Sequence, residues 1–210
     1  MTQPAAFWDR HAQRYARRPI KNMAAYEETL AHVTRHLTPA DRAIELGCGT
    51  GTTALLLADS VAHLTGTDIS GGMIEIARGK AAAQHVENVD FKVSDADAEG
   101  FDTGAFDAVL AFNLIHLLPD PRQAALTARR LLKPGGLFLS KTPCLAHNTV
   151  LLRPLVWVLR KLGIAPAVTF LSHDGLEQAI AAAGFEILET GLYPTKSTSR
   201  FIVARRLGDH

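Results

Sequence analysis

The run Ile44-Glu45-Leu46-Gly47-Cys48-Gly49-Thr50-Gly51 decides the fold of this chain. It begins as a strand, and its alternate glycines allow the backbone to turn sharply into a helix that starts at Thr52. A turn of this kind leaves no side chain between the backbone and a ligand at the carboxyl end of the strand. The run therefore predicts a strand-turn-helix unit that binds a ligand against its main chain.

Strand-like and helix-like runs alternate after this turn. The expected strands are residues 43–46, 63–67, 89–93, 106–112 and 137–140, and the expected helices between them are 52–60, 72–83 and 121–132. Asp120 is placed to cap the last of these helices with Pro121 at its first position, and the run Lys133-Pro134-Gly135-Gly136 ends it. This alternation predicts a mainly parallel sheet.

The C-terminal part of the sequence departs from the alternation. Residues 185–192 and 201–206 both have strand character, and the run Tyr193-Pro194-Thr195-Lys196-Ser197 separates them. A short loop joins antiparallel strands, whereas a parallel pair needs a crossover connection. We therefore expect an α/β fold with a doubly wound, mainly parallel seven-stranded Rossmann-like sheet and an antiparallel C-terminal edge hairpin.

Composition bounds the class of protein. A chain of 210 residues with 47% hydrophobic content is expected to form one domain around one core. Its 22 basic and 21 acidic residues leave a net charge of +1, which provides no general attraction to nucleic acid. Two cysteines, no signal peptide and no apolar stretch near the ~20 residues that span a bilayer predict a cytoplasmic protein without a membrane span.

Polar residues follow three successive predicted strands. Asp68 ends the second strand, Asp95 and Ala96 come just after the third, and Asn113 follows the fourth. Because the carboxyl ends of parallel strands meet at one edge of a sheet, these residues are expected to line one pocket. A dinucleotide-binding turn would carry a third glycine where this sequence has Thr52, and this argues against a nicotinamide cofactor.

Over about residues 42–140 these motifs resemble the class I S-adenosylmethionine-dependent methyltransferases of the small-molecule type. The resemblance implies S-adenosylmethionine as cofactor and a small-molecule methyl acceptor as partner. It places the glycine turn at the methionine part, the acid after the second strand at the ribose, and the residues after the third strand at the adenine. The residues that it assigns to the cofactor are Tyr15, Glu45, Gly47, Cys48, Gly49, Thr50, Gly51, Asp68, Ile69, Met73, Asp95, Ala96, Asn113 and Leu114.

Methyl transfer from a sulfonium is an in-line displacement, which a protein assists mainly by holding donor and acceptor together and excluding water. A hydroxyl, an acidic carbon or a protonated amine as acceptor also needs a general base. His116 is the candidate catalytic residue for that role, because it follows Asn113 closely at the ligand-binding edge of the sheet. The alternative is a histidine that only packs.

The other reactive side chains are weaker candidates. His32 and His36 have a spacing that metal ligands can have, but the residues between them lack the glutamate of a zinc hydrolase helix, and no metal site is predicted. His147 and His173 follow the fifth strand, where acceptor contacts are expected. Cys48 has no neighbouring base and fits the turn as a small side chain.

Two segments outside the core are expected to select the acceptor. We divide the single domain, residues 1–210, into an N-terminal helical lid (1–40), a cofactor-binding core (41–142), an acceptor-pocket insertion (143–172) and a C-terminal helix with the edge hairpin (173–210). In residues 7–37 the spacing of Tyr26, Leu30, Val33 and Leu37 predicts an amphipathic helix.

The insertion carries an apolar helix over residues 151–162, with Pro154 expected at its start and Trp157 at its centre. Such a helix packs in the core, covers an apolar acceptor, or lies on a membrane surface. The sequence favours methylation of a small, apolar metabolite, since a macromolecular substrate would call for a basic surface or a recognition domain. A cofactor-binding regulator without turnover stays an open alternative, because fold does not settle function.

Overall fold

The protein is described by a computed structural model that covers residues 3–20, 22–146, 149–195 and 197–208. The helices are α1 (Gln3–Ala16), α2 (Met23–Thr34), α3 (Thr52–Leu57), α4 (Gly71–Gln84), α5 (Pro121–Leu131), α6 (Thr149–Lys161) and α7 (His173–Ala182), with short 3₁₀ helices η1 (Ala58–Ser60) and η2 (Ile115–Leu117). The strands are β1 (Arg42–Leu46), β2 (His63–Asp68), β3 (Val89–Val93), β4 (Phe106–Phe112), β5 (Leu132–Pro143), β6 (Phe185–Leu192) and β7 (Ser199–Arg206).

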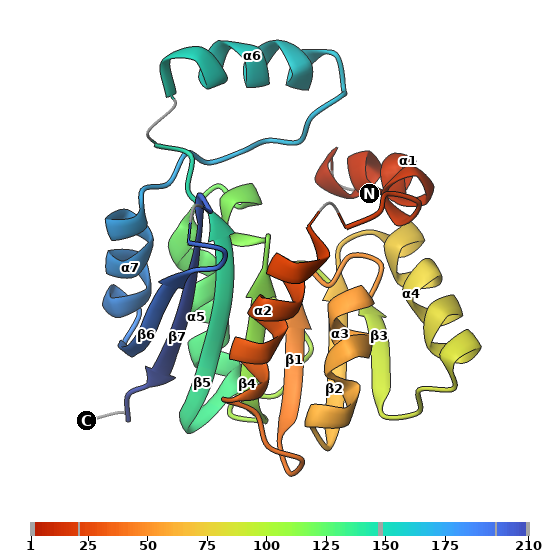
Figure 1. Ribbon diagram of the computed structural model, residues 1–210, viewed down its shortest axis with the longest axis vertical. Helices are drawn as coiled ribbons and strands as arrows, with labels where there is room; N and C mark the ends of the chain where they lie inside the picture. Colours follow the sequence, from red (N-terminus) through yellow and green to blue (C-terminus); the bar gives the residue numbers. More distant parts are fainter. Residues whose placement is uncertain (1–2, 21, 147–148, 196, 209–210) are drawn as a thin grey trace.

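The seven strands form one sheet in the order β3-β2-β1-β4-β5-β7-β6, which confirms the predicted fold class (Figure 1). Strands β1 to β5 run parallel, and β7 lies antiparallel between β5 and β6. The strand order reverses direction between β1 and β4, which both leave their carboxyl ends at one edge. In open α/β sheets, ligands bind in the crevice at this point.

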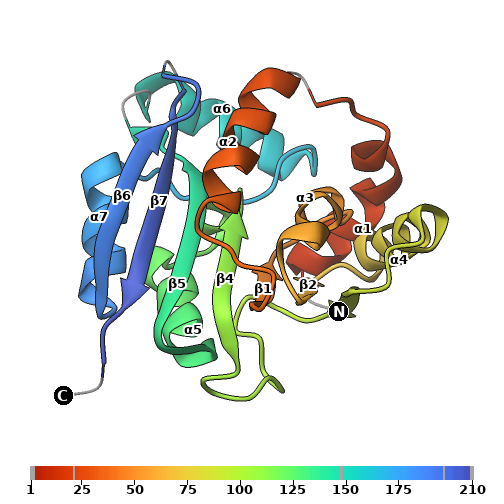
Figure 2. The ribbon, with the colours of Figure 1, turned by 60° about the horizontal axis from the view of Figure 1, so that its bottom comes forward.

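Helices cover both faces of the sheet and complete two apolar layers (Figure 2). On one face, α5 and α7 pack on residues such as Ile44 and Val109. On the other face, α2, α3 and α4 pack on residues such as Ala43 and Leu64. Neighbouring strand residues point to opposite faces, so β1 is buried on both sides and its end is held rigidly.

The helix that the spacing of Tyr26, Leu30, Val33 and Leu37 predicts is present as α2, which ends at Thr34, and a second helix precedes it. Residues 7–37 contain two helices, because α1 ends at Ala16 and α2 begins only at Met23. Pro19 lies between them, and proline both lacks an amide hydrogen and disfavours helical backbone at the residue before it. Leu37 follows the end of α2, although it is buried as the spacing requires.

Two further boundaries need correction. Strand β5 begins at Leu132 instead of residue 137, because Leu132 already pairs with Phe106 across a bulge. Pro154 lies inside α6 and does not start it. The caps at Asp120 and Pro121 are confirmed, since the Asp120 side chain accepts a hydrogen bond from the N–H of Arg122.

Helix α6 and helix α1 lie beyond the same edge of the sheet, the edge where β1 and β4 end (Figure 1). The core-packing interpretation of the insertion is wrong for Trp157, which is 62% exposed, and neighbouring apolar side chains of α6 are exposed as well. Within the described residues, no helix combines the length and the apolar character that crossing a membrane requires.

Candidate functional site

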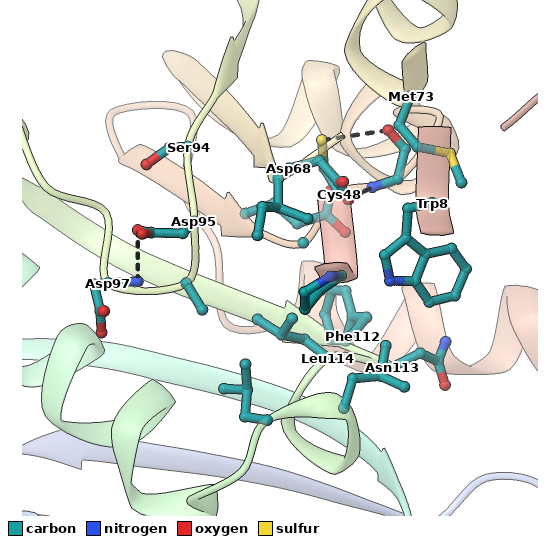
Figure 3. A pocket seen from close by; sticks show the side chains of 18 of the residues that line it. Trp8, Cys48, Asp68, Met73, Ser94, Asp95, Asp97, Phe112, Asn113 and Leu114 are labelled. Carbon is teal, nitrogen blue, oxygen red and sulfur yellow. Dashed lines mark hydrogen bonds between the residues drawn. The ribbon is translucent and has the colours of Figure 1, made fainter. Parts of the chain in front are cut away.

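A cavity of about 280 Å³ lies at the carboxyl ends of β1, β2, β3 and β4 (Figure 3). Its described lining comes from the glycine turn, the three segments that follow β2, β3 and β4, and helices α1, α3 and α5. The lining residues are Pro4, Trp8, Tyr15, Glu45, Gly47, Cys48, Gly49, Thr53, Asp68, Ile69, Met73, Ser94, Asp95, Ala96, Asp97, Phe112, Asn113, Leu114, Leu117, Leu118, Pro119 and Gln123.

The glycine turn exposes its main chain to this cavity. Gly47 and Gly49 both have left-handed backbone, with φ of +67° and +55°. A β-carbon on Gly47 would lie 2.8 Å from Cδ1 of Leu114, so any side chain here would have to displace Leu114 and would strain the left-handed backbone. A β-carbon on Gly49 would meet only Tyr15, at 3.9 Å, and would therefore project into space that a ligand can use.

Asp68 joins the glycine turn to the end of β2. Its Oδ2 accepts a hydrogen bond from the N–H of Gly49 at 2.9 Å, and its Oδ1 accepts one from the N–H of Ser70 at 2.9 Å. Burial raises the pKa of Asp68, and the two amide donors oppose that shift. A carboxylate oxygen accepts more than one hydrogen bond, so acceptor capacity remains for ligand hydroxyl groups.

Glu45 is the most deeply buried carboxyl group of the cavity, with 2% of its surface exposed. Its Oε2 has no hydrogen-bond partner among the described residues. Burial raises the pKa of Glu45 to about 8, and the charge of Asp68 adds to that shift. A buried acceptor without a partner is costly, so the cavity suits a ligand with a cationic donor at this end.

The segment after β3 forms the opposite end of the cavity, where Ser94 and Asp95 lie across from Trp8 and Met73 (Figure 3). Oδ1 of Asp95 accepts a hydrogen bond from the N–H of Asp97 at 3.2 Å, which fixes the loop. The second oxygen of Asp95 remains available to an amine of a ligand.

Helix α1 covers the cavity with Pro4, Trp8 and Tyr15. It is held there by Asp9, whose Oδ1 accepts hydrogen bonds from Ser70 Oγ at 2.6 Å and from the N–H of Gly72 at 3.0 Å. These two bonds lower the pKa of Asp9. Both donors belong to the start of α4, so the cover is attached to the helix beside the cavity.

Two further cavities adjoin the first. The second cavity, of about 750 Å³, shares Tyr15, Thr53, Phe112 and Asn113 with it. The third cavity, of about 220 Å³, shares Pro4, Trp8 and Leu117 with it and lies against the segment that follows α6. The central cavity is therefore bordered by two further cavities, one at Tyr15 and Asn113 and one at Trp8 and Leu117.

Comparison with known proteins gives a family match over the central part of the chain. A protein-family profile described as "Methyltransferase domain" matches residues 43–136. This match covers somewhat less than half of the chain and coincides with the region of the sequence motifs. S-adenosylmethionine is the cofactor that the sequence resemblance implies for such a domain.

Two proteins to which the chain is similar in sequence are named as methyltransferases. The chain is similar to the demethylmenaquinone methyltransferase of Clavibacter sepedonicus, with 39% identity over 49% of this chain and 42% of that protein. It is also similar to the ubiquinone biosynthesis O-methyltransferase of Coxiella burnetii, with 26% identity over 77% of this chain and 71% of that protein. The chain thus spans less than half the length of the first of these relatives.

The fold of the whole chain matches solved structures. A chain of the complex between the Haloferax volcanii Trm112 methyltransferase activator and a methyltransferase has a TM-score of 0.81. The match covers 99% of both chains at 21% identity. The regions outside the profile, including α1, α2 and the C-terminal hairpin, therefore also share the fold of that chain.

The structure brings most predicted site residues of the methyltransferase domain together. Twelve of the fourteen predicted cofactor residues line the central cavity, and Thr50 and Gly51 do not. Thr50 Oγ1 accepts a hydrogen bond from Lys80, and Gly51 faces Phe91 and Ala77, to which a β-carbon would come within 2.6 and 2.8 Å. These two residues serve the packing of the turn.

His116 does not line the central cavity of the described structure, although η2 lies beside it. Burial lowers its pKa to about 4, and its Nδ1 has no partner among the described residues. The imidazole is therefore neutral and weakly basic at neutral pH. Its catalytic role stays a prediction without geometric support.

The structure describes the surroundings of three of the other candidate histidines and of Cys48. His32 Nδ1 and His36 Nε2 lie 3.1 and 2.8 Å from the carboxylate oxygens of Glu189, and no metal-binding group occurs among the described residues. His173 is near the main-chain oxygen of Thr198, and neither it nor His32 lines the central cavity. Burial raises the pKa of Cys48, which disfavours a nucleophilic thiolate. His147 lies outside the described residues.

Ten lining residues were not predicted as site residues: Pro4, Trp8, Thr53, Ser94, Asp97, Phe112, Leu117, Leu118, Pro119 and Gln123. Several of them are direct neighbours in the sequence of residues that were predicted, and this adjacency could have identified them as lining residues. Among the described residues of the insertion, those that line one of these three cavities all line the third, and they are Arg160, Gly163, Ala165, Pro166 and Ala167. The loop between β6 and β7 lines the second cavity instead, which the sequence did not predict.

Proposed function

We propose that this chain transfers the methyl group of S-adenosylmethionine to a small molecule. The observation that carries the proposal is the open main chain at Gly49, which donates a hydrogen bond to Asp68 and lines the central cavity together with Asp68 and Glu45. The carboxyl group of Glu45 fits a cationic amine, and that of Asp68 fits a diol. The cofactor contains both groups.

The remaining residues of the cavity would hold the cofactor along its length. Asp95 would accept a hydrogen bond from the exocyclic amine of the adenine, and Ile69 and Met73 would contact the ring. Tyr15 and Asn113 would lie near the methionine end. These contacts are a proposal that follows the arrangement of the lining.

The bound cofactor supplies a methyl group on a positively charged sulfur, which becomes a neutral thioether when the methyl bonds to the acceptor. The residues around the cofactor would align it with the acceptor and exclude water. Helix α1 would exclude water from the central cavity through Trp8 and Tyr15, while Asp9 holds the helix in place. Alignment of donor and acceptor at short distance accounts for much of the rate that such a site can provide.

A small acceptor with an apolar body is the substrate class that we propose. The second cavity, of about 750 Å³, has the dimensions of a small-molecule site, and its lining includes Leu30 and Phe112. The smaller third cavity is lined in part by Phe7 and Trp8. Two relatives are named for demethylmenaquinone and ubiquinone biosynthesis, and a quinone-type ring is consistent with these cavities. A cytoplasmic location stays a prediction from the sequence.

Isothermal titration calorimetry tests the cofactor assignment. S-adenosylmethionine and NADH are titrated separately into the wild-type protein, Asp68→Ala and Gly49→Val. Gly79→Val is the matched control, because a β-carbon on Gly79 meets no atom within 4 Å. We expect only S-adenosylmethionine to bind, and we expect Gly49→Val to abolish binding. Binding of NADH, or equal binding by Gly49→Val and Gly79→Val, would overturn the proposal.

A second experiment separates an enzyme from a cofactor-binding regulator. The protein is incubated with methyl-labelled S-adenosylmethionine and a small-molecule extract, and products are resolved by mass spectrometry. A labelled small molecule that Gly49→Val does not produce supports the enzyme. If the wild-type protein binds the cofactor but labels nothing in extracts of several cell types, the regulator becomes the better description.

A further inference from the structure

The second cavity contains one cationic side chain among its described lining residues, that of Lys141. Lys141 lies near the carboxyl end of β5, beside Phe112 in the neighbouring strand. Its Nζ donates hydrogen bonds to Thr29 Oγ1 at 2.5 Å and to the main-chain oxygen of Tyr193 at 2.8 Å. Helix α2 and the loop after β6 thus fix the ammonium group at the cavity wall.

An ammonium group has three donor hydrogens, and the two neutral oxygens account for two of them. The described lining of the second cavity contains no aspartate or glutamate. Burial lowers the pKa of Lys141, which shows that its charge is poorly solvated, and the charge of Glu28 on α2 partly opposes that effect. An anionic group in the cavity would therefore gain a donor and relieve the desolvated charge.

The rest of the lining fits an aromatic or aliphatic body with polar groups at its edge. Leu30, Phe112 and Pro194 supply apolar contact, and hydroxyl groups come from Tyr26 and two serines. Tyr26 is itself held by a hydrogen bond of 2.9 Å between its hydroxyl and Thr53 Oγ1. Thr53 belongs to the wall that the second cavity shares with the central one.

That shared wall determines what a ligand in the second cavity would meet. Tyr15 and Asn113 line both cavities, and they are the residues that the proposed function assigns to the methionine end of the cofactor. An acceptor in the second cavity would approach the methyl group from this side. The third cavity adjoins the central one through Pro4, Trp8 and Leu117 and lacks these two residues.

We propose that the second cavity is the acceptor site and that Lys141 selects acceptors with an anionic oxygen, either a carboxylate or an ionised phenol or enol. This proposal rests on the proposed function for the identity of the cofactor, but the anion site itself does not depend on it. Pairing with the fixed ammonium would favour the ionised form of a phenol or enol, which is the form that accepts a methyl group.

Ligand-observed NMR with benzoate and benzamide tests the anion site, because the two probes share a shape and differ in charge. We expect the wild-type protein to bind benzoate at least tenfold more tightly than benzamide, with or without S-adenosylhomocysteine. Lys141→Gln can still donate to Thr29 and Tyr193 but has no charge, and we expect it to lose this preference. Lys141→Arg should keep it.

Lys133→Gln is the control, since Lys133 lies at the opposite end of β5 in an ion pair with Asp107 and should leave the preference unchanged. Equal binding of the two probes by the wild-type protein, or an unchanged preference in Lys141→Gln, would overturn the proposal. If Lys141→Gln instead weakens S-adenosylmethionine binding tenfold, Lys141 binds the carboxylate of the cofactor and the proposal is also overturned. Failure of the wild-type protein to bind S-adenosylmethionine overturns the proposed function alone.

Discussion

The N–H of Gly49 donates a hydrogen bond of 2.9 Å to Oδ2 of Asp68, which fixes the glycine turn against the end of the neighbouring strand. The other oxygen of Asp68 accepts from the N–H of Ser70. An asparagine at position 68 offers one acceptor oxygen, so one of the two amides would lose its partner. We expect Asp68→Asn to lower the free energy of unfolding by about 1–3 kcal/mol and to weaken S-adenosylmethionine binding at least tenfold.

Thermal unfolding and calorimetry measure these two effects. Asp90→Asn is the control, because the Asp90 side chain is 63% exposed and lies away from the cavity. An affinity within twofold of the wild-type value in Asp68→Asn would show that this carboxylate does not contact the cofactor.

Proton release on cofactor binding tests Glu45. With a pKa of about 8, roughly nine-tenths of the Glu45 carboxyl groups are protonated at pH 7. A cationic amine beside the group would favour its ionised form, so binding at pH 7 should release close to one proton. The heat of binding in buffers of different ionisation enthalpy reports this number. We expect Glu45→Gln to release none, and an equal release from Glu45→Gln would rule out Glu45 as the source.

The same group makes stability depend on pH. An unfolded chain binds the Glu45 proton with a pKa near 4.5, whereas the folded protein holds it up to about 8. The folded state therefore binds more protons in this interval, and its free energy of unfolding falls as pH rises from about 4.5 to 8. Denaturant unfolding of the wild-type protein should show a steeper decline over this range than Glu45→Gln shows.

Asp9 should control the attachment of α1. Removing its carboxylate in Asp9→Ala leaves Ser70 Oγ and the N–H of Gly72 without their shared acceptor. We expect faster proteolysis in residues 17–20 and a several-fold loss of cofactor affinity. Asp9→Asn keeps one acceptor oxygen but loses the charge, so we expect an effect between those of the wild-type protein and Asp9→Ala.

The attachment should also weaken in acid. The pKa of Asp9 is lowered by its bonds in the folded protein, so their contribution is present above the ordinary value and is lost as pH falls through the lowered one. Proteolysis of residues 17–20 that does not change as the pH falls from 6 through the lowered pKa of Asp9, followed in the same series of buffers by its titration, would contradict this role.

Gly51 should matter for folding and not for direct cofactor contact. An alanine there would combine left-handed backbone, at φ +74°, with contacts of 2.6 Å to Phe91 and 2.8 Å to Ala77. We expect Gly51→Ala to lower the free energy of unfolding by about 2 kcal/mol or more, as measured by denaturant unfolding. Gly100 also has positive φ but open surroundings, so Gly100→Ala should cost clearly less.

Substitution of His116 tests the predicted general base. Because its pKa is about 4 and it does not line the central cavity, we expect His116→Gln to lower the rate of methyl transfer less than tenfold. A positioned base contributes roughly a hundredfold or more. A loss of that size, with unchanged S-adenosylmethionine affinity, would establish His116 as the base.

The sequence predicts best those strands whose ends are marked by polar or turn-forming residues. Strands β3, β4 and β6 have the predicted bounds, since each is a β-prone run that ends at polar or turn-forming residues. Helix α6 extends back to Thr149, and its proline did not mark the start as expected. A proline inside a helix removes one main-chain hydrogen bond and favours a kink, but it does not always end the helix.

The candidate site was predictable where its residues follow strand ends, as Asp68, Asp95 and Asn113 do. The second cavity was not predictable in this way. Lys141 is an ordinary residue of a strand in the sequence, and its neighbours Thr29 and Tyr193 are distant along the chain. Only the antiparallel pairing of β7 with β5 and the position of α2 bring the three together.

The side chain of Tyr15 on α1 borders both the central cavity and the second cavity, and this links the opening of the two cavities. A displacement of α1 that frees one occupant also uncovers the other. The two products of a turnover would then leave during the same opening event, and α1 would have to close again over two new ligands. Turnover would on this basis show a single opening rate that limits both release steps, and a slower opening would slow both equally.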